Sequence, residues 1–181
     1  EVAFPITFLK ITMNINKGLN MEECTGAGIV VYYDNRDHSI EGLARDIVYL
    51  ILTDRIGYYD FPKGGIDLDF GEYSFDCALR ETDEEINLKR SDFEMFHGEE
   101  SKDGFPCGRG LIMFIGKIKK ESIGNTKRKV NEKTGHLEHI DDNWLTKEEI
   151  SSEMIEIEGV ETNRLPMYLQ QCLNWASEKI V

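Results

Sequence analysis

The sequence predicts an α/β sandwich of the α+β type, in which helices pack against a mixed β-sheet. Two observations lead to this fold class: apolar, β-branched segments stand on both sides of one amphipathic helix, and another helix closes the chain. The chain has 181 residues, of which 40% are hydrophobic and 30% are charged. That length and composition are enough for one sizeable hydrophobic core.

The first part of the chain reads as two strands joined by a turn. Residues 26–33 are β-branched and aromatic, and residues 47–53 are apolar enough for a central strand. Between them, residues 34–39 have the Asp, Asn and Ser content of a turn. Residues 1–20 show no clear period, so we expect them to be an N-terminal extension or tail to a domain spanning residues 21–181.

A helix is predicted from about residue 73 to residue 88. Five of its residues fall within one arc of about 100° at 100° per residue, which is the pattern of a buried stripe. These are Phe75, Ala78, Leu79, Thr82 and Ile86.

Strands and loops alternate after this helix. Residues 93–97 read as a short strand, and residues 98–108, with three glycines and a proline, as a loop. Residues 111–118 are strongly apolar and predict another strand. Residues 119–135 are polar and basic, which is typical of an exposed loop, and residues 139–145 read as the final strand.

Two helices are predicted near the C-terminus. The first is short and begins after Thr146, with Glu149 at the position of a capping box. The second covers roughly residues 165–179. Its inner side is expected to carry Leu165, Leu169, Cys172, Leu173 and either Trp175 or Ala176.

Charge and cysteine content restrict the kinds of partner. The formal net charge is −13, which disfavours general polyanion binding, although bound cations can invert the local field. The four cysteines form no C-x-x-C pair and predict reduced thiols in a cytoplasmic protein. No apolar run approaches the ~20 residues of a membrane span, and the N-terminus lacks the pattern of a signal peptide.

Three glutamates point to metal chemistry. Glu81, Glu84 and Glu85 lie at i, i+3 and i+4, so they share the helix face opposite the apolar stripe. Mg²⁺ and Mn²⁺ favour such oxygen ligands together with substrate phosphates. Arg80 can reach Glu84 and can also anchor Glu72. A solvated acidic helix face is the alternative for the glutamates taken alone.

The segment Phe61-Pro62-Lys63-Gly64-Gly65 precedes this helix. Its glycines allow the backbone to approach a ligand closely, and Lys63 supplies one cation for a phosphate. Glycine loop and acidic helix together are what a protein needs to hold divalent cations against a diphosphate.

This segment resembles the box of the Nudix hydrolase family, G-x5-E-x7-R-E-U-x-E-E-x-G-U, where U is a bulky aliphatic residue. Glu72, seven intervening residues and then Arg80-Glu81-Thr82-x-Glu84-Glu85 match its register. Three positions depart from it: the loop before Glu72 is one or two residues longer, Thr82 replaces an aliphatic residue, and Asn87 replaces the last glycine. Asparagine tolerates the left-handed conformation better than most residues, so the helix end can survive.

The resemblance implies a Nudix-type α/β/α sandwich and an Mg²⁺-dependent hydrolase, with Mn²⁺ as a substitute. Glu81, Glu84 and Glu85 would coordinate the metal together with the carbonyl of a box glycine, taken as Gly64. Glu81 would also orient or deprotonate a water that attacks phosphorus, beside Arg80 in the catalytic set. Lys63 would stabilise the developing charge.

The substrate is a separate question. Pro62-Lys63-Gly64 and Glu138-His139-x4-Trp144 look most like the dinucleoside tetraphosphate (Ap4A) hydrolases of the family, and next most like its mRNA-decapping enzymes. That resemblance makes Glu138 a further metal ligand or general base, or else an ordinary loop carboxylate. Tyr58 and Tyr59 stand where a base could stack, and a core position is the alternative for each.

A basic segment leaves other substrates open. Residues 117–133 hold seven basic residues against two acidic ones, which could guide a polyphosphate, an inositol pyrophosphate or capped RNA; a solvated loop is the alternative. The candidate functions are therefore hydrolysis of a nucleoside polyphosphate or dinucleotide, mRNA decapping and hydrolysis of inositol pyrophosphates. A Nudix-fold nucleotide-binding module without catalysis is the non-enzymatic one.

Overall fold

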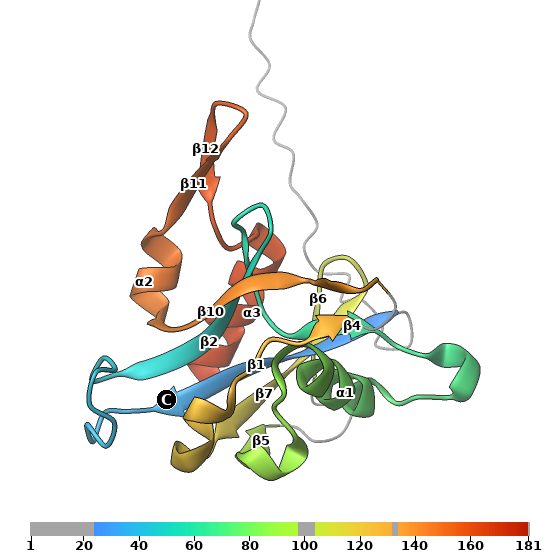
Figure 1. Ribbon diagram of the computed structural model, residues 1–181, viewed down its shortest axis with the longest axis horizontal. Coiled ribbons are helices and arrows are strands. Elements are labelled where there is room, and N and C mark those ends of the chain that lie inside the picture. The colour runs from blue at the N-terminus through green and yellow to red at the C-terminus, as the bar shows by residue number, and fades with distance from the viewer. Residues whose placement is uncertain (1–23, 98–103, 132–133, 181) are drawn as a thin grey trace, which may run out of the picture.

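The computed structural model describes residues 24–97, 104–131 and 134–180. The expected extension at residues 1–20 lies outside them. Figure 1 shows a central sheet with helices packed on it and the β11–β12 hairpin extending from it. The strands are β1 Gly26–Asp34, β2 Ile47–Asp54, β3 Tyr59–Asp60, β4 Lys63–Gly65, β5 Phe93–His97, β6 Phe105–Cys107, β7 Leu111–Ile118, β8 Val130–Asn131, β9 His136–Leu137, β10 His139–Thr146, β11 Met154–Ile157 and β12 Val160–Asn163. The helices are α1 Ser74–Ile86, α2 Lys147–Ser152 and α3 Met167–Ile180, with 3-10 turns at Leu68–Phe70, Arg90–Asp92 and Lys120–Asn125.

The sheet is mixed, as predicted. Its main path runs β10-β2-β1-β7-β5, while β3, β4 and β6 pair with β2, β1 and β7 respectively. Strands β1 and β7 are parallel, with Ile29 opposite Phe114, and every other pairing in the sheet is antiparallel. The α+β fold class is therefore confirmed.

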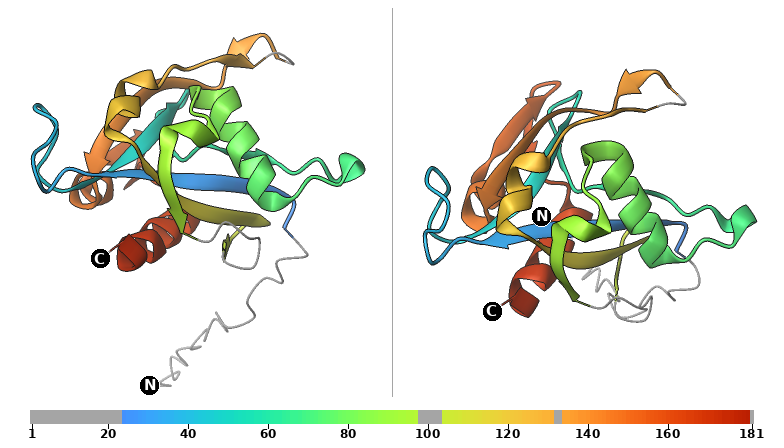
Figure 2. Two further views of the ribbon diagram at one scale, coloured as in Figure 1. Left: turned by 90° about the horizontal axis from the view of Figure 1, so that it is seen from below. Right: turned by 60° about the horizontal axis from the view of Figure 1, so that its bottom comes forward.

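Two helices cover opposite faces of this sheet (Figure 2). Alternate residues of β1 face opposite ways: Ile29 and Val31 belong to the buried cluster that includes Phe75 and Ile86 of α1. Val30 and Tyr32 belong to the cluster that includes Leu169 and Leu173 of α3. Because both faces are covered, β1, β2 and β7 can be apolar almost throughout, which explains their continuous hydrophobic runs.

Helix α1 ends where the sequence indicated a left-handed residue. Asn87 has φ 64° and its N–H donates to the carbonyl of Asp83, so it caps the helix as glycine would. The helix stops at Ile86, two residues before the predicted end. Helix α2 has the expected capping box: Thr146 and Glu149 exchange hydrogen bonds between side chain and backbone.

Several sequence predictions are corrected. The predicted loop 98–108 contains β6, and the predicted loop 119–135 contains the 3-10 turn Lys120–Asn125 and strand β8. These short elements pair with or pack on β7, β9 and α1 and have no strong period of their own. The hairpin β11–β12 was not expected, and α3 begins at Met167 rather than near Leu165. Among the described residues, the structure has no helix both long and apolar enough to cross a membrane.

Strand β4 approaches β1 so closely that Gly28 has no room for a side chain. A Cβ there would lie 2.5 Å from the Cβ of Lys63 and 2.5 Å from the carbonyl oxygen of Pro62. Gly65, paired with Gly26 in the same ladder, has open space around the equivalent position.

We therefore expect Gly28→Ala to destabilise the protein by about 2–3 kcal/mol, because backbone must move to admit the methyl group. Gly65→Ala is the matched control and should change the free energy of unfolding by less than about 0.5 kcal/mol. Denaturant unfolding followed by circular dichroism measures both, and equal effects of the two substitutions would contradict this account of the β1–β4 contact.

Candidate functional site

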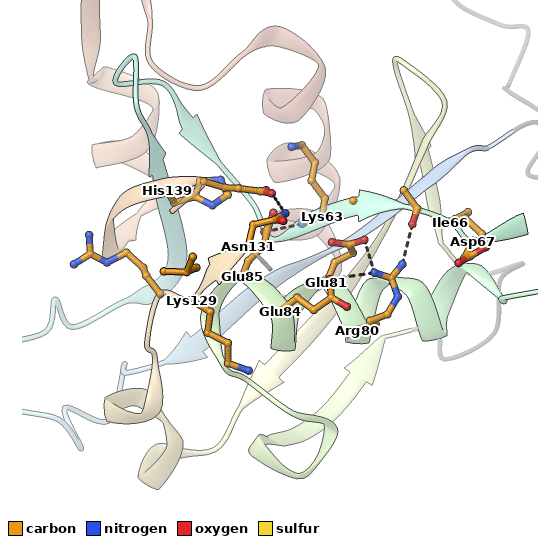
Figure 3. Close-up of a pocket in the computed structure, with 15 residues that line it drawn as sticks. Lys63, Ile66, Asp67, Arg80, Glu81, Glu84, Glu85, Lys129, Asn131 and His139 are labelled. Atoms are coloured by element: carbon orange, nitrogen blue, oxygen red, sulfur yellow. Dashed lines mark hydrogen bonds and ion pairs between the residues drawn. The ribbon is translucent and has the colours of Figure 1, made fainter. Parts of the chain in front are cut away.

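One pocket of about 830 Å³ lies between α1, β4 and the residues Arg128, Lys129, Val130, Asn131, Glu138 and His139. It gathers seven of the residues selected from the sequence (Figure 3). These are Lys63, Gly64, Arg80, Glu81, Glu84, Glu85 and Glu138. Residues distant in the sequence thus meet because α1 packs on β1 and β4 while β10 pairs with β2.

Helix α1 supplies three lining glutamates, Glu81, Glu84 and Glu85, which together are called the acidic wall. The opposite face of the helix is held in the core by Phe75, Ala78 and Ile86. Thr82, where the family box has an aliphatic residue, is also buried, and its hydroxyl donates to the carbonyl of Ala78 at 2.7 Å. This local bond satisfies the buried hydroxyl, so threonine is accommodated in the apolar face of α1.

Gly64 packs directly against the carboxylate of Glu81. A Cβ at Gly64 would overlap that carboxylate, whereas Gly65 has free space. Both carbonyls have a donor: Arg80 Nη2 donates to that of Gly65 at 2.8 Å, and Cys77 Sγ donates to that of Gly64 at 3.7 Å. Gly64 is therefore the glycine whose backbone stands beside the acidic wall, despite the longer loop that follows.

Arg80 fixes this arrangement from the loop side. Its Nε and Nη2 donate to the two oxygens of Glu72 at 2.8 and 3.0 Å, a bidentate pair. Its Nη1 donates to Glu81 at 2.7 Å and lies 3.4 Å from Glu84. The hydrogen bond from Arg80 is the main reason that the pKa of Glu72 falls below its usual value. The predicted anchoring of Glu72 and contact with Glu84 by Arg80 are both present.

The glutamates differ in their contact with water. Glu84 is 57% exposed, whereas Glu81 is only 15% exposed. Burial raises the pKa of Glu81, and Glu84 and Glu138 raise it further against the opposing effect of Arg80. Burial raises the pKa of Glu85 well above its ordinary value, and Asp60 and Glu138 add to the shift. A cation between these carboxylates would relieve both costs.

Lys63 forms the cationic side of the pocket. Its backbone N–H donates to Glu85 Oε2 at 3.2 Å, and its ammonium donates to Asp60 Oδ2 at 2.7 Å. Burial alone would lower the pKa of Lys63, but the Asp60 carboxylate raises it above its usual value. Lys63 therefore stays charged beside the acidic wall.

The segment above α1 adds polar groups of both signs. Asn131 donates to the exposed carboxylate of Glu138 through its side-chain amide. Arg128 lies 3.3 Å from Asp142, and Lys129 lies 2.6 Å from Asp83. Sequence reasoning noted the basic run as a whole but could not show that, among its described residues, Arg128 and Lys129 line the pocket.

The two tyrosines are not among the residues that line this pocket. Tyr59 is 5% exposed in the cluster under α3, and the guanidinium of Arg164 lies 4.0 Å from its ring centroid. Of the two alternatives for Tyr59, base stacking and a core position, the covered ring supports the core position. Tyr58 is half-buried and its N–H is bound by Asp54.

The donor set fits a hard divalent cation. Carboxylate oxygens of Glu81, Glu84 and Glu85, with the backbone of Gly64 beside them, are the ligand type of Mg²⁺ and Mn²⁺. Within the described ranges, however, no three His, Cys, Asp or Glu side chains are gathered as in a formed metal site. Glu81 instead pairs with Arg80, and Glu85 with the N–H of Lys63.

Comparison with known proteins places the fold. No model of a protein family matches the sequence, and no curated protein matches it either. A C. elegans Ap4A hydrolase structure matches with a TM-score of 0.53 and 19% identity, over 87% of this chain and 99% of that chain. The NUDIX domain of Shewanella oneidensis NrtR, complexed with ADP ribose, matches with a TM-score of 0.54 and 12% identity over 88% and 89%. The M. smegmatis Nudix hydrolase RenU matches with a TM-score of 0.55 and 13% identity over 88% of each chain.

Arg80→Lys tests the role of the guanidinium in holding the site. Lysine keeps the charge but cannot bind both oxygens of Glu72 and also the carbonyl of Gly65. We expect a loss of about 1–2 kcal/mol in the free energy of unfolding, since the guanidinium is partly exposed. Arg36→Lys is the control: Arg36 makes a bidentate pair with Asp34 at the surface, and its substitution should leave the melting temperature unchanged. Equal effects would contradict a structural role for the Arg80 fork.

Glu85→Gln tests the buried charge in metal-free protein. Because the folded-state pKa of Glu85 is raised, ionisation costs the folded state stability as pH rises above the unfolded pKa near 4.5. Glutamine removes that cost, so the variant should gain on the order of 1 kcal/mol over the parent protein at pH 8 relative to pH 5. Thermal unfolding in EDTA at the two pH values measures this, and a pH-independent difference would contradict it.

Proposed function

We propose that this chain, whose fold is that of the Nudix hydrolases, is a pyrophosphohydrolase that cleaves a diphosphate linkage in a nucleoside polyphosphate. One observation carries the proposal: the desolvated carboxylates of Glu81 and Glu85 share one pocket with Gly64 and Lys63. A cation site beside a phosphate-binding cation is the arrangement that diphosphate hydrolysis requires.

The metal expected here is Mg²⁺, with Mn²⁺ as a substitute. Glu81, Glu84, Glu85 and the carbonyl of Gly64 would hold it, with Glu138 as a further ligand from the opposite wall. When bound, such a cation polarises the diphosphate and lowers the pKa of a water molecule.

The chain's own residues then have distinct tasks. Glu81, whose pKa is raised chiefly by burial, is suited to accept the proton of the attacking water at its carboxylate, with Glu138 as the alternative base. Arg80 keeps the Glu81 carboxylate in one orientation through the 2.7 Å hydrogen bond. Lys63 donates to the phosphate oxygens on which charge develops.

Within this class, a bis(5'-nucleosyl)-tetraphosphate is the best candidate substrate. The motif around Glu138 and the fold shared with the C. elegans Ap4A hydrolase support it. The covered ring of Tyr59 removes one argument for base stacking.

Capped RNA is the second candidate substrate, because Arg128 and Lys129 of the basic segment line the pocket. Each of these cations already has a carboxylate partner, which weakens the argument for a long RNA path. Inositol pyrophosphates remain candidates on charge alone. A binding module without catalysis would not need the complete set of box carboxylates.

A substrate panel with Mg²⁺ and with Mn²⁺ tests the reaction class, with products identified by mass. Dinucleoside tetraphosphate, ADP ribose, capped RNA and an inositol pyrophosphate cover the candidate substrates. We expect turnover of the dinucleotide, and turnover of none of the four in either metal would contradict the proposal.

Glu85→Gln tests the metal mechanism with the preferred substrate from that panel. We expect the rate to fall at least ~100-fold, because a buried metal ligand and its charge are lost. Asp76→Asn is the matched control, since Asp76 lies exposed on the same helix and outside the pocket. Retained turnover in Glu85→Gln, with Asp76→Asn also active, would refute the assigned role of Glu85.

A further inference from the structure

Asp60 lies at the end of the short strand β3 and is not part of the Nudix-type motif. Strand β3, which pairs with β2, carries it to a position 18% exposed beside Lys63 and His139. Its Oδ1 accepts from the N–H of Phe61 at 2.8 Å. Its Oδ2 accepts from Lys63 Nζ at 2.7 Å and lies 3.7 Å from Nε2 of the buried His139. Both oxygens are therefore engaged, so Asp60 is a fixed group.

This pair differs from the surface ion pairs of the protein. The side chains of Lys63 and Asp60 are 19% and 18% exposed, and a buried charge that loses its partner is costly. Asp60 therefore decides where the Lys63 ammonium stays. Figure 3 shows the Lys63 side chain running away from Glu81 and Glu85.

The direction of the Lys63 side chain matters because the main chain of the same residue is bonded to Glu85. Its N–H already donates to Glu85 Oε2, so the residue is attached to the acidic wall. Lys63 and Glu85 each shift the pKa of the other, which places the ammonium within electrostatic reach of that carboxylate. Besides Asp60, Glu85 is the carboxylate whose charge acts on the Lys63 ammonium, so the acidic wall would attract the ammonium if Asp60 were absent.

We propose that Asp60, supported by His139, is a positioning residue that keeps the Lys63 ammonium off the carboxylates of Glu85 and Glu81 and so leaves them free for a divalent cation. The inference rests on the proposed function, because it assigns the acidic wall to a metal. Asp60 itself is neither a ligand nor a base in this arrangement. It holds the ammonium of Lys63 away from the cation-binding wall.

The test is a double-mutant cycle on Mn²⁺ affinity, measured without substrate by titration calorimetry or by the electron paramagnetic resonance of free Mn²⁺. Asp60→Asn should weaken Mn²⁺ binding by about 10-fold, because Lys63 then competes for the carboxylates. In the Lys63→Met background the same change should weaken it by less than about 3-fold, since no competitor remains. Asp60→Glu, which keeps the charge, should stay within about 3-fold of the parent protein.

The cycle distinguishes competition from a simple change in net charge. If the loss of one negative charge were the whole cause, Asp60→Asn would weaken Mn²⁺ binding equally with and without Lys63. That result would overturn the proposal. So would an unchanged affinity in Asp60→Asn. If Asp60→Asn fails to fold in thermal unfolding, His139→Gln takes its place: it should weaken Mn²⁺ binding by about 3-fold, reversed by Lys63→Met.

Measurements on the parent protein distinguish a failure of the proposed function from a failure of the role assigned to Asp60. Absence of Mn²⁺ binding and of turnover in the parent protein would remove the proposed function and this inference with it. Mn²⁺ binding and turnover in the parent protein, together with no coupling between Asp60 and Lys63, would remove only the inference.

Discussion

The contact between the carboxylate of Glu81 and the backbone of Gly64 is the constraint on which the rest of the site depends. It brings α1 so close to β4 that no side chain fits at Gly64. Glu81 is only 15% exposed, and its largely buried carboxylate is paired with the guanidinium of Arg80. Arg80 in turn binds Glu72 and the carbonyl of Gly65, so the loop between β4 and α1 is held at both ends.

The same closeness keeps opposite charges within one pocket. Glu81 and Glu85 are kept from water on one wall, while Lys63 is attached to that wall by its own N–H. Oppositely charged side chains so close together would form ion pairs with each other unless each had another partner. Arg80 for Glu81 and Asp60 for Lys63 are those partners, and each is fixed by further hydrogen bonds of its own.

Prediction from the sequence succeeded where one element alone carries the signal. The face of α1 that bears the glutamates, the left-handed Asn87 and the capping box at Thr146 depend on local periodicity and short-range bonds. It failed for β6 and for the hairpin β11–β12. These are short segments that become strands by pairing with a neighbour, so their residues show little period beforehand. The sequence left open whether Tyr59 stacks on a base or lies in the core, because Arg164, which covers its ring, is distant in the sequence.

The sequence by itself determined that one helix face carries the charged residues Arg80, Glu81, Glu84 and Glu85 and that a glycine loop precedes this helix. Helical geometry is a local property, so spacing alone brings these side chains to one face. Only the tertiary structure decided which glycine meets Glu81, and that Asp60 and His139 stand beside Lys63. Asp60 and Lys63 stand on the neighbouring strands β3 and β4, whereas His139 comes from β10, far along the chain; all three positions depend on how these strands pair in the sheet. No local pattern records such pairing, because its energy comes from burial and hydrogen bonds between segments.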